Sequence, residues 1–165
     1  MKELRVVISN DQKTVKIPKG IRMIIRRCCK AILVMEDIND CAEIFVTFTD
    51  DAGFLELNSQ YLSSPSDNGV MILPSGENSV FPENQATGAK MLGNVVISVE
   101  KAFNRCEALG RSVEREVGYL TTHGVLGLLG YNNKKGLEKA LLREKEEYIM
   151  EQIGFPLAMS YAAVQ

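Results

Sequence analysis

The segment EIFVTFTDD, residues 43–51, joins the two signals that decide the fold. Most of its residues up to Thr49 are β-branched or aromatic, which is typical of a strand. Thr49, Asp50 and Asp51 then offer side-chain oxygens that accept the free backbone N–H groups of a helix start. The helix expected there carries the apolar side chains of Phe54, Leu55, Leu57 and Tyr61. A strand that leads directly into a helix is consistent with an α/β fold.

Working outward from this segment, the chain offers further strands and helices on both sides. Short segments rich in apolar residues predict strands at residues 4–8, 70–73 and 94–99. Helical spacing and helix-end signals predict helices at residues 21–32, 100–110, 112–129 and 136–153. Apart from the short strand expected at residues 70–73, we expect residues 63–90 to be loop. A long loop in a compact domain is often functional.

The two C-terminal helices carry clear end signals. Ser112 is expected to cap the helix at residues 112–129, with Glu114 and Glu116 near its positive end. Gly130 suits a left-handed stop after that helix. For the last helix we expect an inward face made of Leu137, Leu141, Tyr148, Ile149 and Ile153.

Length and charge limit the possible classes of protein. The 165 residues suit one domain with one core, and a net charge of −2 gives the whole chain no general attraction to nucleic acid. The helix at residues 21–32 nevertheless places basic side chains opposite its apolar face, at Arg22, Arg26, Arg27 and Lys30. These bases are either a solvated helix face or a patch that faces RNA, and the sequence leaves both interpretations open.

Nothing in the chain resembles a membrane span or an export signal, because no stretch approaches about 18 uninterrupted apolar residues. We therefore expect a cytoplasmic protein with no membrane partner. The cysteines are then expected to be reduced and mostly buried: Cys28, Cys29, Cys41 and Cys106. They form no CxxC pair, so their spacing gives a structural zinc site little support.

The segment THGVLGLLGYNN, residues 122–133, carries the chemistry. A helix that binds a metal usually offers ligands at positions i and i+4, on one face, and a third ligand follows the turn. Here His123 fills the first position and Gly130 supplies the turn. The i+4 position is Gly127, which has no side chain, and the position after the turn is Asn133. An amide oxygen is a weak ligand for zinc compared with imidazole or thiolate.

From about residue 4 to residue 155 the chain resembles the YbeY family, whose signature reads HGxLHLLGYDH. Further matching blocks are VTFTDD, LNSQY, LGNVVIS, RSVEREVGYLTTHG and EKEEYIMEQIG. The resemblance implies a single YbeY-like domain at residues 1–155 and a C-terminal tail at residues 156–165. It also implies an α/β (α+β) fold with a small mixed sheet of four strands and about five helices, in which His123 lies in a cleft between its helix and the long loop.

The family resemblance implies a single-strand-specific, zinc-dependent endoribonuclease that takes part in ribosomal RNA maturation, with RNA and the ribosome as partners and no DNA. This chain departs from the family at the functional positions. The second and third metal histidines read as Gly127 and Asn133, and the aspartate before the last histidine reads as Asn132. The family's catalytic arginine reads as Leu62, and the family's GDI reads as GNV at residues 93–95.

Since His123 is the only histidine in the chain, it cannot belong to a three-histidine site within one chain. We therefore expect zinc to be weakly bound or absent and catalysis to be lost or severely impaired, with His123 as the residual metal position. The alternatives are an active metal-dependent endoribonuclease with an atypical site and a non-catalytic interaction protein. A Ser98–His123 pair and a rescuing Cys106 ligand have little support. The candidate RNA contacts are Lys101, Arg105, Arg111 and Arg115.

Overall fold

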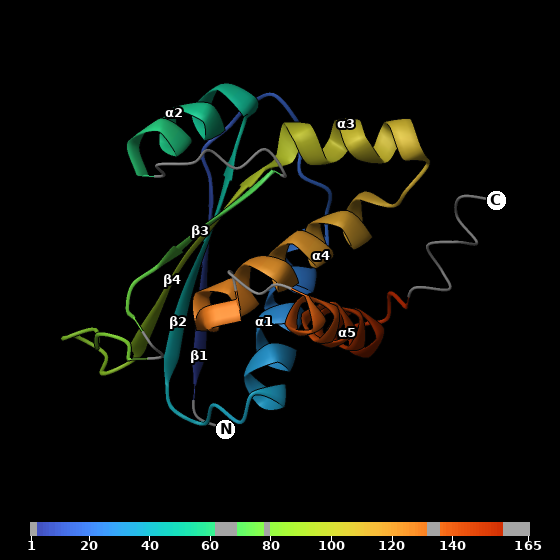
Figure 1. Ribbon diagram of the computed structural model, residues 1–165. Coiled ribbons are helices and arrows are strands. Elements are labelled where there is room, and N and C mark those ends of the chain that lie inside the picture. Colours follow the sequence, from blue (N-terminus) through green and yellow to red (C-terminus); the bar gives the residue numbers. More distant parts are fainter. Residues whose placement is uncertain (1–2, 62–68, 78–79, 132–135, 157–165) are drawn as a thin grey trace.

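A four-stranded mixed sheet forms the centre of the computed structural model, which describes residues 3–61, 69–77, 80–131 and 136–156 (Figure 1). The strands in spatial order are β1 (Leu4–Asn10), β2 (Ala42–Thr49), β4 (Lys90–Ser98) and β3 (Val70–Pro74). β1 and β4 both pair with β2 in parallel, and β3 pairs with β4 in antiparallel fashion. The predicted mixed sheet of four strands is confirmed.

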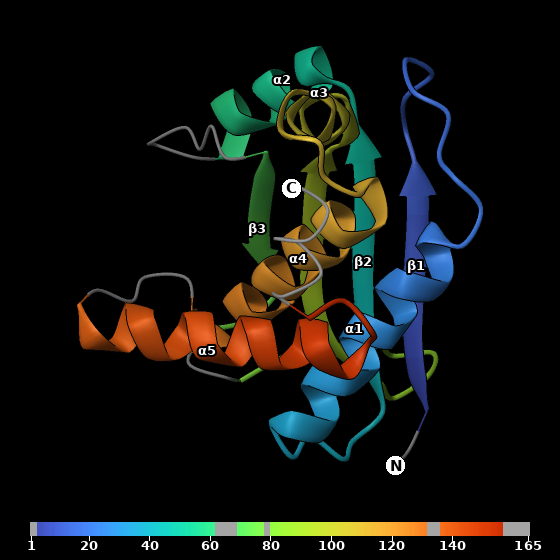
Figure 2. The ribbon, with the colours of Figure 1, turned by 90° about the vertical axis from the view of Figure 1, so that its right-hand side faces the viewer.

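Five α-helices surround the sheet within the described ranges. They are α1 (Ile21–Met35), α2 (Asp51–Tyr61), α3 (Val99–Leu109), α4 (Val113–Leu126) and α5 (Leu137–Gln152). Figure 2 shows α1, α4 and α5 in front of one face of the sheet, whereas α2 and α3 lie at the end where β2 and β4 finish. After α4 the chain bends within Gly127–Tyr131, where Gly130 has non-helical backbone angles. The predicted α+β class is therefore confirmed.

Two glycines let α4 approach its neighbours closely. A Cβ atom at Gly124 would overlap the side chain of Val95 on β4. A Cβ atom at Gly118 would lie 3.2 Å from Ile24 of α1 and 3.3 Å from Met150 of α5. α4 is therefore fixed between the sheet and the other two helices, and side chains on it have well-defined positions.

Three of the predicted helix-end signals are confirmed, whereas the helix predicted at residues 21–32 extends to Met35. The Asp50 carboxylate accepts the N–H of Gly53 at 2.8 Å at the start of α2, and the Ser112 hydroxyl accepts the N–H of Arg115 at 3.2 Å at the start of α4. Gly130 has φ 104°, which is the left-handed conformation expected at the stop. Local capping chemistry thus sets where these helices begin and end.

The predicted inward face of α5 is largely wrong. Leu137, Leu141 and Tyr148 are 73%, 55% and 50% exposed, and Ile149 alone of the expected residues is fully buried. The buried stripe instead consists of Leu142, Glu146, Ile149 and Met150. Both stripes have helical spacing, and contact with α4 selects the one that includes a glutamate.

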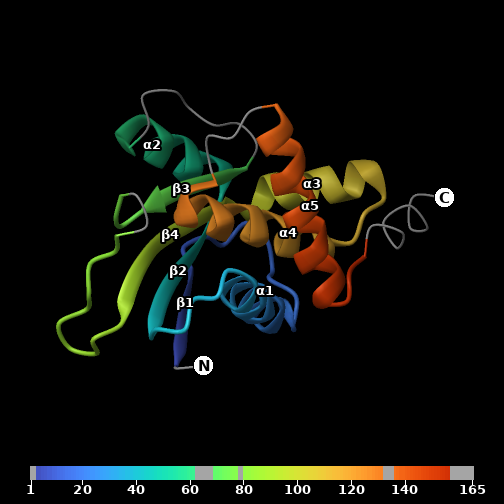
Figure 3. The same ribbon diagram turned by 60° about the horizontal axis from the view of Figure 1, so that its bottom comes forward.

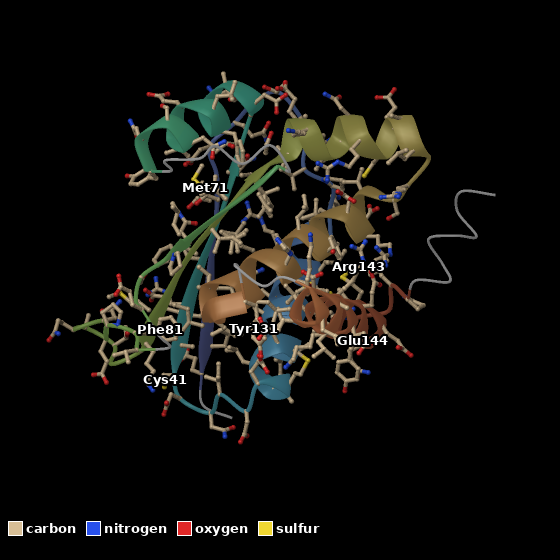
Figure 4. All side chains as sticks on the ribbon, in the orientation of Figure 1. Cys41, Met71, Phe81, Tyr131, Arg143 and Glu144 are labelled. Carbon is tan, nitrogen blue, oxygen red and sulfur yellow. The ribbon has the colours of Figure 1, made fainter. Side chains whose placement is uncertain are left out.

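The opposite face of the sheet is covered in part by α2. Phe54 of α2 packs against Met71 and Val96, and Figure 4 shows Met71 below α2. Val96 points away from α4 because side chains alternate along a strand and its neighbour Val95 faces α4. None of the described helices is both long and apolar enough to cross a membrane.

Candidate functional site

His123 lies on α4 and faces α5. Its Nδ1 atom is 2.5 Å from Oε2 of Glu146, whose side chain is 4% exposed. An ionised carboxylate only accepts hydrogen bonds, so Nδ1 carries the hydrogen in this pair and Nε2 is left for another partner. The histidine side chain is 29% exposed, so a ligand can approach it.

Tyr119, one helical turn before His123, binds the other oxygen of the same carboxylate. Its hydroxyl donates to Oε1 of Glu146 at 2.9 Å, and its ring stacks on the imidazole with centroids 6.4 Å apart. Burial raises the pKa of Tyr119 well above its usual value, and the nearby Glu146 carboxylate is the second cause of this increase. We call Tyr119, His123 and Glu146 the α4–α5 cluster. It holds a carboxylate and an imidazole in one fixed arrangement.

At the position of the family's second metal ligand, a neighbouring side chain fills the space that a ligand would need. Gly127 is buried, and a Cβ atom added there would overlap Cδ1 of Ile72 on β3. Cγ2 and Cγ1 of Ile72 would lie 3.1 and 3.2 Å from the same atom. An imidazole at position 127 would therefore need Ile72 to move, so the packing is matched to glycine.

The side chains present do not fit a zinc ion held by three imidazoles. The sequence has one histidine, and within the described ranges no group of three histidine, cysteine, aspartate or glutamate residues is placed to hold a metal. Burial raises the pKa of Cys28 to about 12 and that of Cys106 to about 11, which disfavours the thiolates that zinc prefers. Asn133 and Leu62 lie outside the described residues.

Two of the four candidate RNA contacts are engaged by carboxylates. Arg105 pairs with Glu116 at 2.6 Å, and Arg115 pairs with Glu147 at 2.9 Å. The remaining two differ in position: Lys101 lies with Arg105 beside Gly69, and Arg111 is exposed after α3. Charge that an arginine shares with a carboxylate is less available to a phosphate, so these four residues do not form one uncompensated patch.

The other polar positions have partners away from His123. The Ser98 hydroxyl is fully buried, donates to Oδ1 of Asp51 at 2.6 Å and caps α3. Asn94 accepts a hydrogen bond from the Thr47 hydroxyl at 3.1 Å. The contacts of Ser98 and His123 lie on different elements, so the structure gives a Ser98–His123 pair no support.

Sequence reasoning missed Glu146. On a helix as charged as α5, a glutamate is usually solvated, and the apolar residues suggested a different inward face. A usable signal existed, because Leu142, Glu146 and Ile149 follow helical i, i+4, i+7 spacing. The pairing with His123, which lies 23 residues away, became visible only when α4 and α5 met.

Comparison with known proteins gives the family. The family model described as Endoribonuclease YbeY matches residues 7–154. A protein named Endoribonuclease YbeY from Caldanaerobacter subterraneus is 37% identical over 159 residues, which cover 92% of this chain and 98% of that protein. One of the same name from Caldicellulosiruptor saccharolyticus is 34% identical, with the same shares covered.

The fold agrees with this comparison. The solution structure of TM1509 from Thermotoga maritima superposes with a TM-score of 0.54 and covers 89% of this chain and 90% of that one, at 17% identity. Sequence and fold together place the chain among α+β proteins related to endoribonucleases. It belongs to the YbeY family.

Proposed function

We propose that this chain is a cytoplasmic YbeY-family protein that associates with RNA during ribosome biogenesis and whose zinc site and hydrolytic activity are lost or severely impaired. The observation that carries this proposal is the packing at Gly127, where Ile72 fills the space that a ligand would need. Family membership supports RNA as the partner class. The role in ribosomal RNA maturation follows the family resemblance.

The expected loss of metal affinity and of hydrolytic activity is large. Removing a single outer partner of a metal ligand typically lowers affinity or activity about 10–100-fold, and this chain lacks two of the ligands themselves. A tightly bound metal would otherwise polarise the phosphoryl oxygen and supply a nucleophilic water at neutral pH. The lone imidazole of His123 does not replace these two contributions.

The carboxylate–imidazole pair favours a second candidate, an active endoribonuclease with an atypical site. Glu146 fixes the ring of His123, and a histidine oriented by a carboxylate is an arrangement that enzymes use for proton transfer. This candidate predicts cleavage of single-stranded RNA that falls when His123 is replaced. A protein without any RNA affinity is the third possibility, and salt-dependent RNA binding separates it from the first.

The test is the zinc content of the untagged protein together with its activity on single-stranded RNA. We expect zinc well below one ion per chain, unrestored by added zinc, and no cleavage that a chelator abolishes. His123→Ala should then leave any residual cleavage unchanged. One zinc per chain with chelator-sensitive cleavage that His123→Ala abolishes would contradict the proposal.

A matched variant sharpens this test. Gly127→His combined with Ile72→Ala supplies an imidazole and the space for it, whereas Ile72→Ala alone supplies only the space. Adding Asn133→His to the first variant restores the family's three histidines. We expect zinc binding to rise only in the variant with all three, which would show that the missing ligands limit the natural chain.

A further inference from the structure

Basic charge is concentrated in one continuous segment of the chain. Residues 12–35 contain seven of the 19 lysines and arginines and none of the 21 aspartates and glutamates. The remainder of the chain is therefore strongly acidic, although the net charge of the whole is only −2. Such segregation creates a local potential that the overall charge conceals.

The structure brings these seven residues to the surface around α1. All of them are exposed, and we call them the α1 basic face: Lys13, Lys16, Lys19, Arg22, Arg26, Arg27 and Lys30. The three lysines precede α1, and Arg22, Arg26 and Lys30 follow each other at i, i+4 spacing along it. This spacing presents a basic side chain about every 6 Å along the helix axis. Figure 3 looks nearly along α1, which lies between β1 and α5.

Within the described part of the chain, no carboxylate forms an ion pair with the α1 basic face. Every ion pair between described residues uses a base from elsewhere: Arg5, Lys90, Arg105, Arg115, His123 or Lys145. α1 is held in place by its opposite side, where Ile21, Ile25 and Ile32 are buried. Arg22 also donates a hydrogen bond to the carbonyl of Ile8 at 3.4 Å, but the packing of α1 rests on its apolar side. The mutual repulsion of the basic side chains is relieved best by an anion from outside.

A groove next to these bases adds an aromatic ring. It has a volume of about 390 Å³, lies between α1 and the end of α5, and is lined by Arg27, Lys30, Val34 and Tyr148 among others. Tyr148 is 50% exposed and Val34 is 62% exposed. Proteins that bind single-stranded nucleic acid combine basic side chains along the backbone with aromatic rings on which bases stack.

We propose that the α1 basic face binds the phosphate backbone of single-stranded RNA and that Tyr148 stacks on a base in the adjoining groove. The proposal rests on RNA being the partner of the proposed function, and it names a surface different from Lys101, Arg105, Arg111 and Arg115. Arg27 and Lys30 border both the helix face and the groove, so one strand can contact both.

The test compares two variants with the same change in charge. The first replaces Arg22, Arg26, Arg27 and Lys30 with glutamine, and the control replaces Lys101, Arg111, Lys139 and Arg143 with glutamine. Affinity for a short single-stranded RNA is measured in the presence of a chelator, between about 50 and 200 mM salt. Circular dichroism checks that both variants are folded.

We expect the first variant to bind at least about tenfold more weakly, with a salt slope reduced by about three, because each phosphate contact in a single strand contributes about 0.7 to that slope. The control should stay within about threefold of the natural chain. An equal loss in both variants, no loss in the first, or no RNA binding by the natural chain would overturn the proposal. So would binding to vesicles of anionic lipid in place of RNA.

Tyr148 gives an independent measurement. Tyr148→Ala should weaken RNA binding about fivefold or more, because a base that stacks on an aromatic ring contributes substantially to affinity. Tyr148→Phe keeps the ring and should bind like the natural chain. Equal affinity of all three proteins would overturn the stacking role. These results do not depend on zinc content or cleavage, so the proposed loss of the hydrolytic centre can fail while this surface stands.

Discussion

Between α4 and α5, the carboxylate of Glu146 is almost fully buried and has both His123 and Tyr119 as partners. On α1, Arg26, Arg27 and Lys30 are exposed, and none of them takes part in an ion pair with another described residue. The fold buries and pairs these charged groups between α4 and α5, whereas it leaves the basic side chains of α1 to solvent.

The difference follows from the cost of removing charge from water. A buried charge is strongly unfavourable unless it is paired and hydrogen-bonded, whereas an exposed charge costs little. The α4–α5 cluster is therefore constrained by stability and would be hard to change. The α1 basic face is free to change without harm to the fold, which is the property expected of a surface whose use lies outside the molecule.

Among the substitutions, the largest expected effect concerns Glu146. Glu146→Ala should lower the free energy of unfolding by about 3 kcal/mol, because the Tyr119 hydroxyl and the His123 ring lose their buried partner. Glu144→Ala, two residues earlier and exposed on the same helix (Figure 4), should change it by less than about 0.5 kcal/mol. Urea unfolding followed by circular dichroism measures both. Similar losses in the two variants would remove the contrast between buried and exposed charge.

The next prediction concerns the tight packing of Ile72 against Gly127. Gly127→His should destabilise the protein by about 2 kcal/mol, because the new side chain overlaps Ile72. Combining it with Ile72→Ala should recover part of this loss, with a coupling of about 1 kcal/mol in the double-mutant cycle. Additive effects would mean that the two positions do not compete for space.

The inner side of α1 predicts a pH dependence. Burial raises the pKa of Cys28 from 9.0 to about 12, so above pH 9 the unfolded chain loses this proton while the folded protein keeps it. The stability that this thiol contributes is therefore fully present below pH 9 and is lost as the pH rises toward 12, by up to about tenfold in the unfolding equilibrium constant per pH unit. Unfolding curves measured across this range test it. A slope that is the same in Cys28→Ala would rule out this thiol as its source.

The smallest expected effect concerns two arginines, one of which is paired with a carboxylate while the other is exposed on α1. Arg115→Gln should cost about 1 kcal/mol, because Arg115 and Glu147 are only 14% and 24% exposed and the glutamate loses its partner. Arg26→Gln should leave the stability within about 0.5 kcal/mol of the natural chain, since the side chain is exposed. If Arg26→Gln were as costly as Arg115→Gln, the α1 basic face would have a structural role.

Local signals in the sequence predicted much of the fold correctly. Asp50, Ser112 and Gly130 mark helix ends, and each has the conformation or hydrogen bond expected of it. These signals work because a cap acts on backbone groups within a few residues of itself. The inward face of α5 was predicted wrongly because two stripes of that helix have helical spacing, and no local rule chooses between them.

By itself the sequence determined the order of strands and helices, the lack of two family histidines, and the gathering of basic residues in residues 12–35. Only the tertiary structure decided that Glu146 meets His123, that Ile72 fills the space beside Gly127, and that the bases around α1 have no carboxylate partner among the described residues. The physical reason is the separation along the chain over which each interaction acts. Capping acts between residues that are close in the sequence, whereas burial and ion pairing depend on which distant elements pack together.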